Sequence, residues 1–302
     1  MKINILGCYA ATPRSFTNPT SQVLEILNNH FLIDCGEGTQ VQLRRNKIKF
    51  SKIKHIFISH LHGDHFYGLV GLVSTFRLLN RETELHIYGP KGIKEIITLQ
   101  LKLANSWTNF PLIFHELTSK EPELILENST VTVTTIPLKH RVYTNGFLFK
   151  EKEGDRKLLI DKAETYNIDF SLFKSLKKGK DVMSEDGKLI PNHLVTADPP
   201  PPKSYAYCSD TVFDPEIVPL IKKATVLYHE STFLEDKADL AQPTKHSTAK
   251  QAATIAKLAE VEKLILGHYS TRYADIELFR IEASTIFPDI ILADDGKEII
   301  VE

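Results

Sequence analysis

One stretch decides the fold of this chain, and it reads Ile56-Phe57-Ile58-Ser59-His60-Leu61-His62-Gly63-Asp64-His65. A short apolar run typical of a β-strand ends in four possible metal ligands within six residues. Side chains two residues apart on extended backbone share a face, so His60 and His62 point the same way. Asp64 and His65 follow at the turn into a helix. Imidazole and carboxylate together suit zinc or, less selectively, iron or manganese. A lone hydrogen-bonded histidine at a strand end would not explain so many ligand groups, and their number suggests two adjacent metals.

Composition limits the classes of protein to which the chain can belong. The 302 residues allow one large α/β domain or two small ones, and 42% hydrophobic with 25% charged residues is typical of an ordinary globular protein. The net charge of -1 provides no global basic field for nucleic acid, so any such contact must use local patches.

The three cysteines are widely spaced, odd in number and form no Cys-x-x-Cys pattern. They argue against a disulfide scaffold or a cysteine zinc site and fit a reducing cytosol. The first residues have a strand pattern that is too short for a signal peptide, and no stretch approaches the ~20 apolar residues of a membrane span. We therefore expect a soluble, cytoplasmic protein.

Strand and helix patterns alternate along most of the chain, which predicts an α/β fold. Strands are expected at 2–7, 23–27, 30–34, 53–58, 85–88, 111–117, 130–137, 142–150, 204–208, 226–229, 263–266, 289–293 and 297–301. Helices are expected at 39–45, 65–79, 91–104, 248–259 and 273–285, with Ser247 as the N-cap of the fourth.

Residues 151–203 differ from their surroundings. They carry many lysines, three glycines and the run Pro199–Pro202, with little sustained periodicity. Ordinary connections are only a few residues long, so this stretch is expected to be an inserted, protruding arm. The remainder, within 1–302, is expected to form a single domain.

Ligand-type residues recur where strands are predicted to end. This holds for His60, His140, Asp210, Glu230 and His268. Side chains collected from strand ends converge on one rim of an α/β sheet, so these residues are expected to meet there.

Several motifs beyond the histidine stretch carry a family resemblance. The His-x-His-x-Asp-His core with a later His, Asp and His resembles the metallo-β-lactamase fold hydrolases. More narrowly, the chain resembles the ribonuclease Z family, which processes the 3′ ends of transfer RNA. The motifs occur in the family's order, and they are Phe31–Gln40, Pro137–Val142, Tyr207–Thr211, His229–Phe233, His246–Ala249 and Gly267–Tyr273.

The resemblance implies an αββα sandwich with two zinc ions per subunit at one edge. One zinc would be held by His60, His62 and His140, the other by Asp64, His65 and His268, and Asp210 would bridge them. Asp34 is expected to support a ligand rather than to bind metal.

The resemblance also implies the reaction. It is zinc-dependent removal of the 3′ trailer of precursor transfer RNA after the discriminator nucleotide, leaving a 3′ hydroxyl, by metal-activated hydroxide attack on phosphorus. Asp64 would orient or deprotonate the water. His246, paired with Glu230, would donate a proton to the leaving oxygen. Helix capping is the alternative role for His246.

Substrate contacts are expected at two places. Ser270 and Arg272 are candidates for phosphate contacts near the metals. The arm occupies the place of the family's substrate-binding exosite, where Lys174, Lys177 and Lys178 would contact RNA phosphates. Its residues 168–173 read Ile-Asp-Phe-Ser-Leu-Phe, where the family often carries a Gly-Pro-rich segment. The family commonly forms homodimers, so a homodimer is expected.

Three other functions fit parts of the pattern. A related phosphodiesterase for small diesters or other RNA would use the same metals. A non-catalytic RNA-binding module would be expected to have lost ligands, and all seven are present. A thioester hydrolase shares the superfamily, but the contexts of Asp210 and His246 match the ribonuclease more closely.

Overall fold

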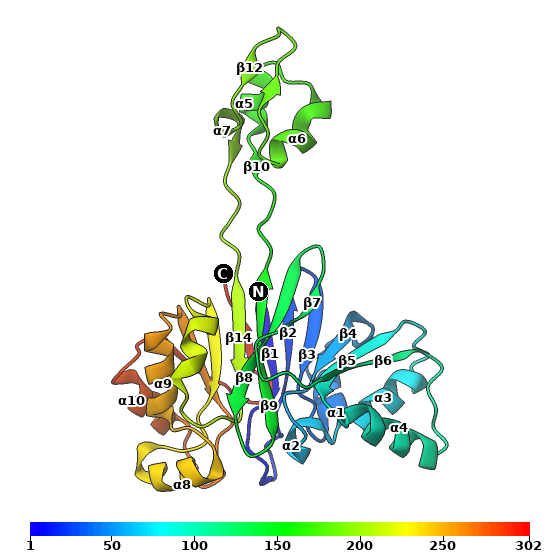
Figure 1. Ribbon diagram of the computed structural model, residues 1–302, viewed down its shortest axis with the longest axis vertical. Coiled ribbons are helices and arrows are strands. Elements are labelled where there is room, and N and C mark those ends of the chain that lie inside the picture. Colours follow the sequence, from blue (N-terminus) through cyan, green and yellow to red (C-terminus); the bar gives the residue numbers. More distant parts are fainter.

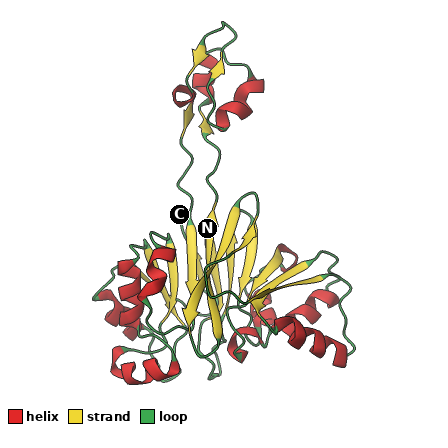
Figure 2. Cartoon of the chain, viewed as in Figure 1, coloured by secondary structure: helices red, strands yellow, loops and turns green.

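The predicted strands, with one more that was not predicted, assemble into two seven-stranded sheets in the computed structural model, which describes residues 1–302. The sheets pack face to face and helices cover both outer surfaces, so the predicted αββα sandwich is confirmed (Figures 1 and 2). No helix combines the length and the apolar character that crossing a membrane requires.

The first sheet contains the strand that leads into the histidine stretch. Its order is β18-β1-β2-β3-β4-β5-β6, antiparallel from β18 to β3 and parallel from β3 to β6. Helices α1, α3 and α4 pack on its outer face around a cluster of 21 buried apolar residues. The bounds are β1 Lys2–Gly7, β2 Ser21–Ile26, β3 Asn29–Ile33, β4 Ile53–Phe57, β5 Leu85–Pro90, β6 Leu112–Leu117, β18 Glu298–Ile300, α1 Thr39–Arg45, η1 Phe50–Lys52, α2 Gly63–Phe66, α3 Leu69–Leu78 and α4 Ile93–Leu103.

The second sheet has the order β17-β16-β15-β14-β9-β8-β7. Its central strands β14 and β15 are buried at every position, as expected for parallel strands covered on both faces. A core of 46 residues fills the space between the sheets and beneath α9 and α10. The bounds are β7 Leu124–Glu127, β8 Val131–Lys139, β9 Tyr143–Glu151, β14 Ser204–Cys208, η3 Pro215–Ile221, β15 Val226–Glu230, η4 Glu235–Lys237, α8 Ala238–Thr244, α9 Ala249–Leu258, β16 Lys263–Gly267, α10 Glu277–Ser284 and β17 Ile290–Leu292.

The stretch between β9 and β14 rises away from the sandwich on two extended segments and ends in a small folded tip (Figure 1). The tip has its own apolar cluster of six buried residues, which include Ile168, Leu176 and Val195. The low periodicity of this stretch hid that core, because its elements are too short to repeat a pattern. The bounds are β10 Lys157–Leu158, α5 Ile160–Thr165, η2 Phe170–Leu172, α6 Phe173–Lys177, β11 Val182–Met183, β12 Leu189–Ile190, α7 Asn192–Val195 and β13 Thr196–Ala197.

The single helix predicted over 65–79 is wrong, because the chain forms α2 and α3 with a break at Gly68. The Gly68 N–H donates to the Cys35 carbonyl (2.9 Å) instead of continuing the α2 ladder. A Cβ at this position would lie 2.0 Å from the Gly36 carbonyl oxygen. The break therefore comes from close approach to the β3–α1 turn, which periodicity does not reveal.

The cap predicted for α9 is also wrong by one residue. Thr248 is the N-cap, and it forms a capping box with Gln251. The Ser247 hydroxyl instead donates to the Thr211 carbonyl at 2.7 Å, which ties the start of α9 to the turn after β14.

The sequence also failed to predict two elements and predicted one helix that is too long. Strand β7 and helix α8 were not predicted: β7 is a short edge strand with exposed ends, and α8 contains Pro243. Helix α10 begins at Glu277 rather than near 273, because the Asp275 carboxylate accepts the Glu277 N–H (2.9 Å) in a turn before the helix.

Candidate metal centre

The predicted ligands meet at one edge of the sandwich. His60 and His62 follow β4, Asp64 and His65 lie in α2, His140 follows β8, Asp210 follows β14, and His268 follows β16. Their ligand atoms form two groups, one with His60, His62, His140 and Asp210 and one with Asp64, His65 and His268, and a third group joins Asp210 and His268 with His246. Within each group the atoms lie within 4.8 Å of one another.

Asp210 stands between the two groups. Its Oδ2 lies 3.6 Å from His60 Nε2 and 3.7 Å from His140 Nε2. Its Oδ1 lies 3.2 Å from both His65 Nε2 and His268 Nε2. One carboxylate oxygen thus faces each group, which is the arrangement a bridging ligand needs.

The ring nitrogens fit metal coordination better than hydrogen bonding. The Nε2 atoms of His65 and His268 are buried and have no hydrogen-bond partner, although each is close to Asp210. In the other group, His62 Nδ1 lies 3.0 Å from His60 Nε2 and 3.3 Å from His140 Nε2. Two nitrogens bound to one tetrahedral zinc lie about 3.3 Å apart. The residues therefore fit a pair of metal ions.

The second nitrogen of each of four histidines is held by a protein group. His140 Nδ1–H donates to the Lys245 carbonyl (2.8 Å), and His268 Nδ1–H donates to Thr232 Oγ1 (2.9 Å). His60 Nδ1 lies 3.0 Å from Ser59 Oγ, and His65 Nδ1–H donates to Asp34 (2.8 Å). These contacts orient the rings so that Nε2 faces the centre.

Electrostatics divides the imidazoles into two kinds. Burial lowers the pKa of His60, His62 and His140, which keeps these rings in the neutral, metal-binding form. Burial also acts on His65, but Asp210, Asp64 and Asp34 outweigh it and hold the pKa of His65 well above its usual range. The carboxylates around His65 therefore favour positive charge at this position, which a metal cation would also supply.

Asp34 is buried and accepts four hydrogen bonds. They come from His65 Nδ1–H (2.8 Å), the Tyr207 hydroxyl (2.6 Å), and the N–H and hydroxyl of Ser59 (2.7 and 2.9 Å). It lies outside both ligand groups. Its contacts position His65 and the start of the histidine stretch.

A second network lies beside the ligands. Glu230 Oε1 accepts from His246 Nδ1–H (2.8 Å) and from the Thr211 N–H (2.9 Å). Its Oε2 accepts the Thr232 hydroxyl (2.6 Å), and Thr232 Oγ1 in turn accepts from His268. Burial disfavours the charged form of His246, but Glu230 outweighs it and raises the pKa of His246 to about 9. His246 is therefore protonated at neutral pH and linked to the ligand group through Glu230 and Thr232.

An open cleft of about 400 Å³ gives access to the cluster. Ser270 and Arg272 line it beside His246, together with Arg141. Lys174, Lys177 and Lys178 lie instead in the arm, where Lys178 pairs with Asp155 at 2.6 Å. The structure thus joins nine of the predicted site residues with Ser270 and Arg272, and it leaves the arm lysines apart.

Known proteins share both the sequence and the fold. A protein named Ribonuclease Z from Cytophaga hutchinsonii is 48% identical over 302 residues, covering 98% of this chain and 95% of the relative. One of the same name from Bacteroides thetaiotaomicron is 45% identical over 295 residues, covering 98% and 93%. The chain belongs to the ribonuclease Z family.

One solved structure agrees with this ribonuclease Z membership, and one family model with a different description matches half of the chain. The crystal structure of human tRNase Z, short form, is 27% identical with a TM-score of 0.74, and each chain is covered completely. Residues 1–152 match the family model described as Anti-Pycsar protein Apyc1. That match ends before Asp210, His246 and His268, so it covers only part of the site.

Four residues of this ribonuclease Z site were given no role from the sequence. Thr232, Ser59 and Tyr207 contact the ligands or their supports, and Arg141 lines the cleft. Thr232 stands two residues after Glu230, and Arg141 directly follows His140. Their position beside ligand-type residues was the available signal.

The Asp34 contacts generate a test. Asp34→Asn replaces one acceptor oxygen by an N–H₂ donor, so it cannot accept all four bonds and leaves His65 poorly oriented. We expect the zinc affinity to fall about 10- to 100-fold, measured by competition with a coloured chelator.

The matched control is Asp289→Asn, which alters an exposed carboxylate that pairs with Lys263. It should bind zinc like the unmodified protein. Unchanged zinc affinity in Asp34→Asn would contradict the supporting role of Asp34.

Proposed function

We propose that this chain is a zinc-dependent endoribonuclease that removes the 3′ trailer of precursor transfer RNA. The cut falls after the discriminator nucleotide and leaves a 3′ hydroxyl. The observation that carries the proposal is the convergence of two ligand groups on Asp210, with His246 in the same cleft and the buried Glu230 paired with it. The relatives named Ribonuclease Z and the likeness to human tRNase Z support the substrate.

Each group of ligands would hold one zinc ion, two per subunit, with Asp210 shared between them. Bound there, the two ions supply Lewis acidity, which makes water acidic and stabilises charge developing at phosphorus. Histidine and carboxylate donors without cysteine suit zinc.

The chain's own groups supply binding and proton transfer. Asp64 Oδ2, which lies 3.5 Å from His65 Nε2 and from His268 Nε2, orients the attacking water and accepts its proton. His246 donates the proton that the leaving oxygen needs, and Glu230 keeps His246 charged until then. Arg141, Arg272 and Ser270 line the cleft and contact the phosphates that flank the cut.

The arm supports a role in substrate binding away from the chemistry. Lys174 and Lys177 of α6 are free to contact RNA phosphates, whereas Lys178 is paired with Asp155. The arm leaves the sandwich at the start of β14 (Figure 1), and Asp210 follows the other end of that strand, so the arm and the proposed ligands lie at opposite ends. This placement favours a homodimer in which the arm of one subunit serves the cleft of the other.

The three cysteines are buried and free, which suits a reducing compartment. We place the enzyme in the cytoplasm, where precursor transfer RNA would meet it.

The direct test is cleavage of a precursor transfer RNA with a 3′ trailer, with the product ends mapped to the nucleotide. Chelation should abolish cleavage and zinc should restore a single cut after the discriminator nucleotide. Deleting 155–200 should remove this cleavage and leave hydrolysis of a small chromogenic phosphodiester intact, because the sandwich and its ligands remain. Brisk diester hydrolysis without any precursor cleavage by the full chain would discard the transfer RNA assignment and favour the related phosphodiesterase.

The His246–Glu230 pair predicts a pH effect. Because activity needs protonated His246, the rate should fall on the alkaline side as His246 loses its proton, near pH 9. Glu230→Gln removes the charge that raises the pKa of His246, so this alkaline limb should move to lower pH. The control Glu262→Gln alters an exposed carboxylate outside the site and should leave the limb in place. A pH–rate profile of Glu230→Gln that matches the unmodified enzyme would exclude His246 as the proton donor.

A further inference from the structure

Positive charge is concentrated in one segment that the catalytic cleft does not use. Residues 44–54 contain six lysines or arginines and no carboxylate, although the whole chain has a net charge of -1. These cations are Arg44, Arg45, Lys47, Lys49, Lys52 and Lys54. Every ion pair of a lysine or arginine in the structure involves other residues. The segment thus keeps its charge available for an external anion.

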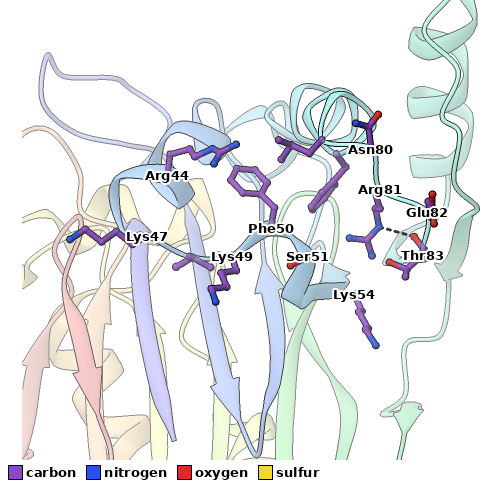
Figure 3. Close-up of a pocket in the computed structure, with 13 residues that line it drawn as sticks. Arg44, Lys47, Lys49, Phe50, Ser51, Lys54, Asn80, Arg81, Glu82 and Thr83 are labelled. Carbon is purple, nitrogen blue, oxygen red and sulfur yellow. Dashed lines mark hydrogen bonds between the residues drawn. The ribbon is translucent and has the colours of Figure 1, made fainter.

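Four of the six cations line a surface cavity of about 600 Å³, which Figure 3 shows. We call this cavity the cationic groove. The four cations are Arg44, Lys47, Lys49 and Lys54, and all four are exposed. The end of α1, η1 and the start of β4 supply these residues. Ser51, Asn80 and Thr83 add polar groups, and Glu82 is the one carboxylate of the lining.

The floor of the groove consists of the buried side chains of Arg81, Phe50 and Phe76, and the guanidinium of Arg81 is already hydrogen-bonded within the protein. Arg81 donates to the carbonyls of Thr83 (2.8 Å), Ile53 (3.0 Å) and Glu84 (2.8 Å), so it has a structural task. Phe50 and Phe76 are buried, with 6% and 1% of their surface exposed. No aromatic face is therefore open for stacking a base.

These features indicate the kind of anion that fits. A compact anion held tightly would need buried, converging donors, and the only nearly buried cation is Arg81. Exposed and flexible lysines in a row suit a linear polyanion, whose phosphates they contact without reading the bases. The groove therefore fits the backbone of a nucleic acid.

A second cavity extends the groove along the edge of the sheet. It has a volume of about 430 Å³ and shares Lys54 and Thr83 with the first. His55 and His86 line it, and His86 is paired with Glu84 at 3.0 Å. Lys54 is the only lysine or arginine in its lining, and burial lowers the pKa of His55 to about 4, so the positive charge of the groove ends at Lys54.

The groove and the metal ligands lie at opposite ends of the same strand. Strand β4 begins at Ile53 beside Lys54 and leads to His60, and five residues of strand span about 17 Å. Strand β14 likewise runs from the base of the arm at Ser204 towards Asp210. The arm and the groove therefore share the end of the sandwich that is remote from the cleft.

We propose that the cationic groove is a second RNA-binding surface, which holds backbone phosphates of the substrate through Arg44, Lys47, Lys49 and Lys54. It rests on the proposed function for the identity of the RNA. It adds a contact that neither the catalytic cleft nor the arm provides. RNA that engages the lysines of α6 meets the groove on the same end of the molecule.

The test compares two triple variants of the full zinc-loaded enzyme. The groove variant is Lys47→Gln, Lys49→Gln and Lys54→Gln. The control variant is Lys223→Gln, Lys250→Gln and Lys257→Gln, which removes the same charge from exposed positions elsewhere. Lys47 and Lys223 have the same positive φ of 56°, so the backbone demand is matched as well. The probes are a transfer RNA without trailer and a short RNA duplex, with affinity measured over a range of salt concentrations.

We expect the groove variant to bind both RNAs roughly tenfold more weakly at moderate salt. Its plot of log affinity against log salt concentration should be shallower by about 1 to 3, since each lost phosphate contact lowers the slope by about 0.9. The control should match the unmodified enzyme, and both variants should hydrolyse a small diester normally. Equal behaviour of the two variants, or weaker binding with an unchanged slope, would overturn the proposal. The duplex result stands even if the chain does not cut precursor transfer RNA, so failure of the groove and failure of the proposed function are distinguishable.

Discussion

The site depends on one shared carboxylate. Asp210 is buried, and its two oxygens face two different groups of imidazoles at 3.2 to 3.7 Å. A buried anion is costly unless cations or hydrogen-bond donors surround it. The imidazoles that surround Asp210 come from three separate segments, after β4, after β8 and after β16, and they meet only when both sheets are in place. The proposed metal centre can therefore form only when the sandwich has folded.

Backbone conformation shows how firmly the site is held. Asp34, Asp210 and His268 adopt left-handed φ angles of 56°, 60° and 60°, and each stands just after a strand. Such angles disfavour residues other than glycine, and they persist only where the surroundings impose them. The left-handed turn lets each side chain point across the sheet edge instead of continuing the strand alternation. The fold thus stores modest strain at a proposed supporting residue, Asp34, and at two proposed ligands, Asp210 and His268.

The proposed metal site and the proposed RNA contacts lie at opposite ends of the sandwich. Strands β4, β14, β15 and β16 all run towards the metal ligands, so their starts lie at the end that carries the arm and the cationic groove. Chemistry needs a rigid edge where ligands converge, whereas a long polyanion needs contacts spread over distance. Placing them at opposite ends lets each be built without compromising the other.

Much of this was predictable from sequence because it is local. The ligand stretch, the strand ends and the α/β class follow from residue types and apolar patterns close together in the chain, whereas the two-sheet sandwich was implied by the family resemblance. The break between α2 and α3 at Gly68 could not be predicted, because it arises from contact with Gly36, 32 positions earlier in the chain. The N-cap of α9 is Thr248 rather than Ser247, because the Ser247 hydroxyl is hydrogen-bonded to the Thr211 carbonyl. The apolar core of the arm depends on the pairing of strands only two residues long. The charge of residues 44–54 was visible in the sequence. Their distance from the cleft became known only from the structure, which shows the direction of β4.

The most direct test of the account is crystallographic: anomalous diffraction at the zinc edge from zinc-loaded crystals. We predict two peaks on either side of Asp210, one beside His60, His62 and His140 and one beside Asp64, His65 and His268. A single peak, or peaks that leave Asp210 uncoordinated, would contradict the claim that one carboxylate joins two metal ions.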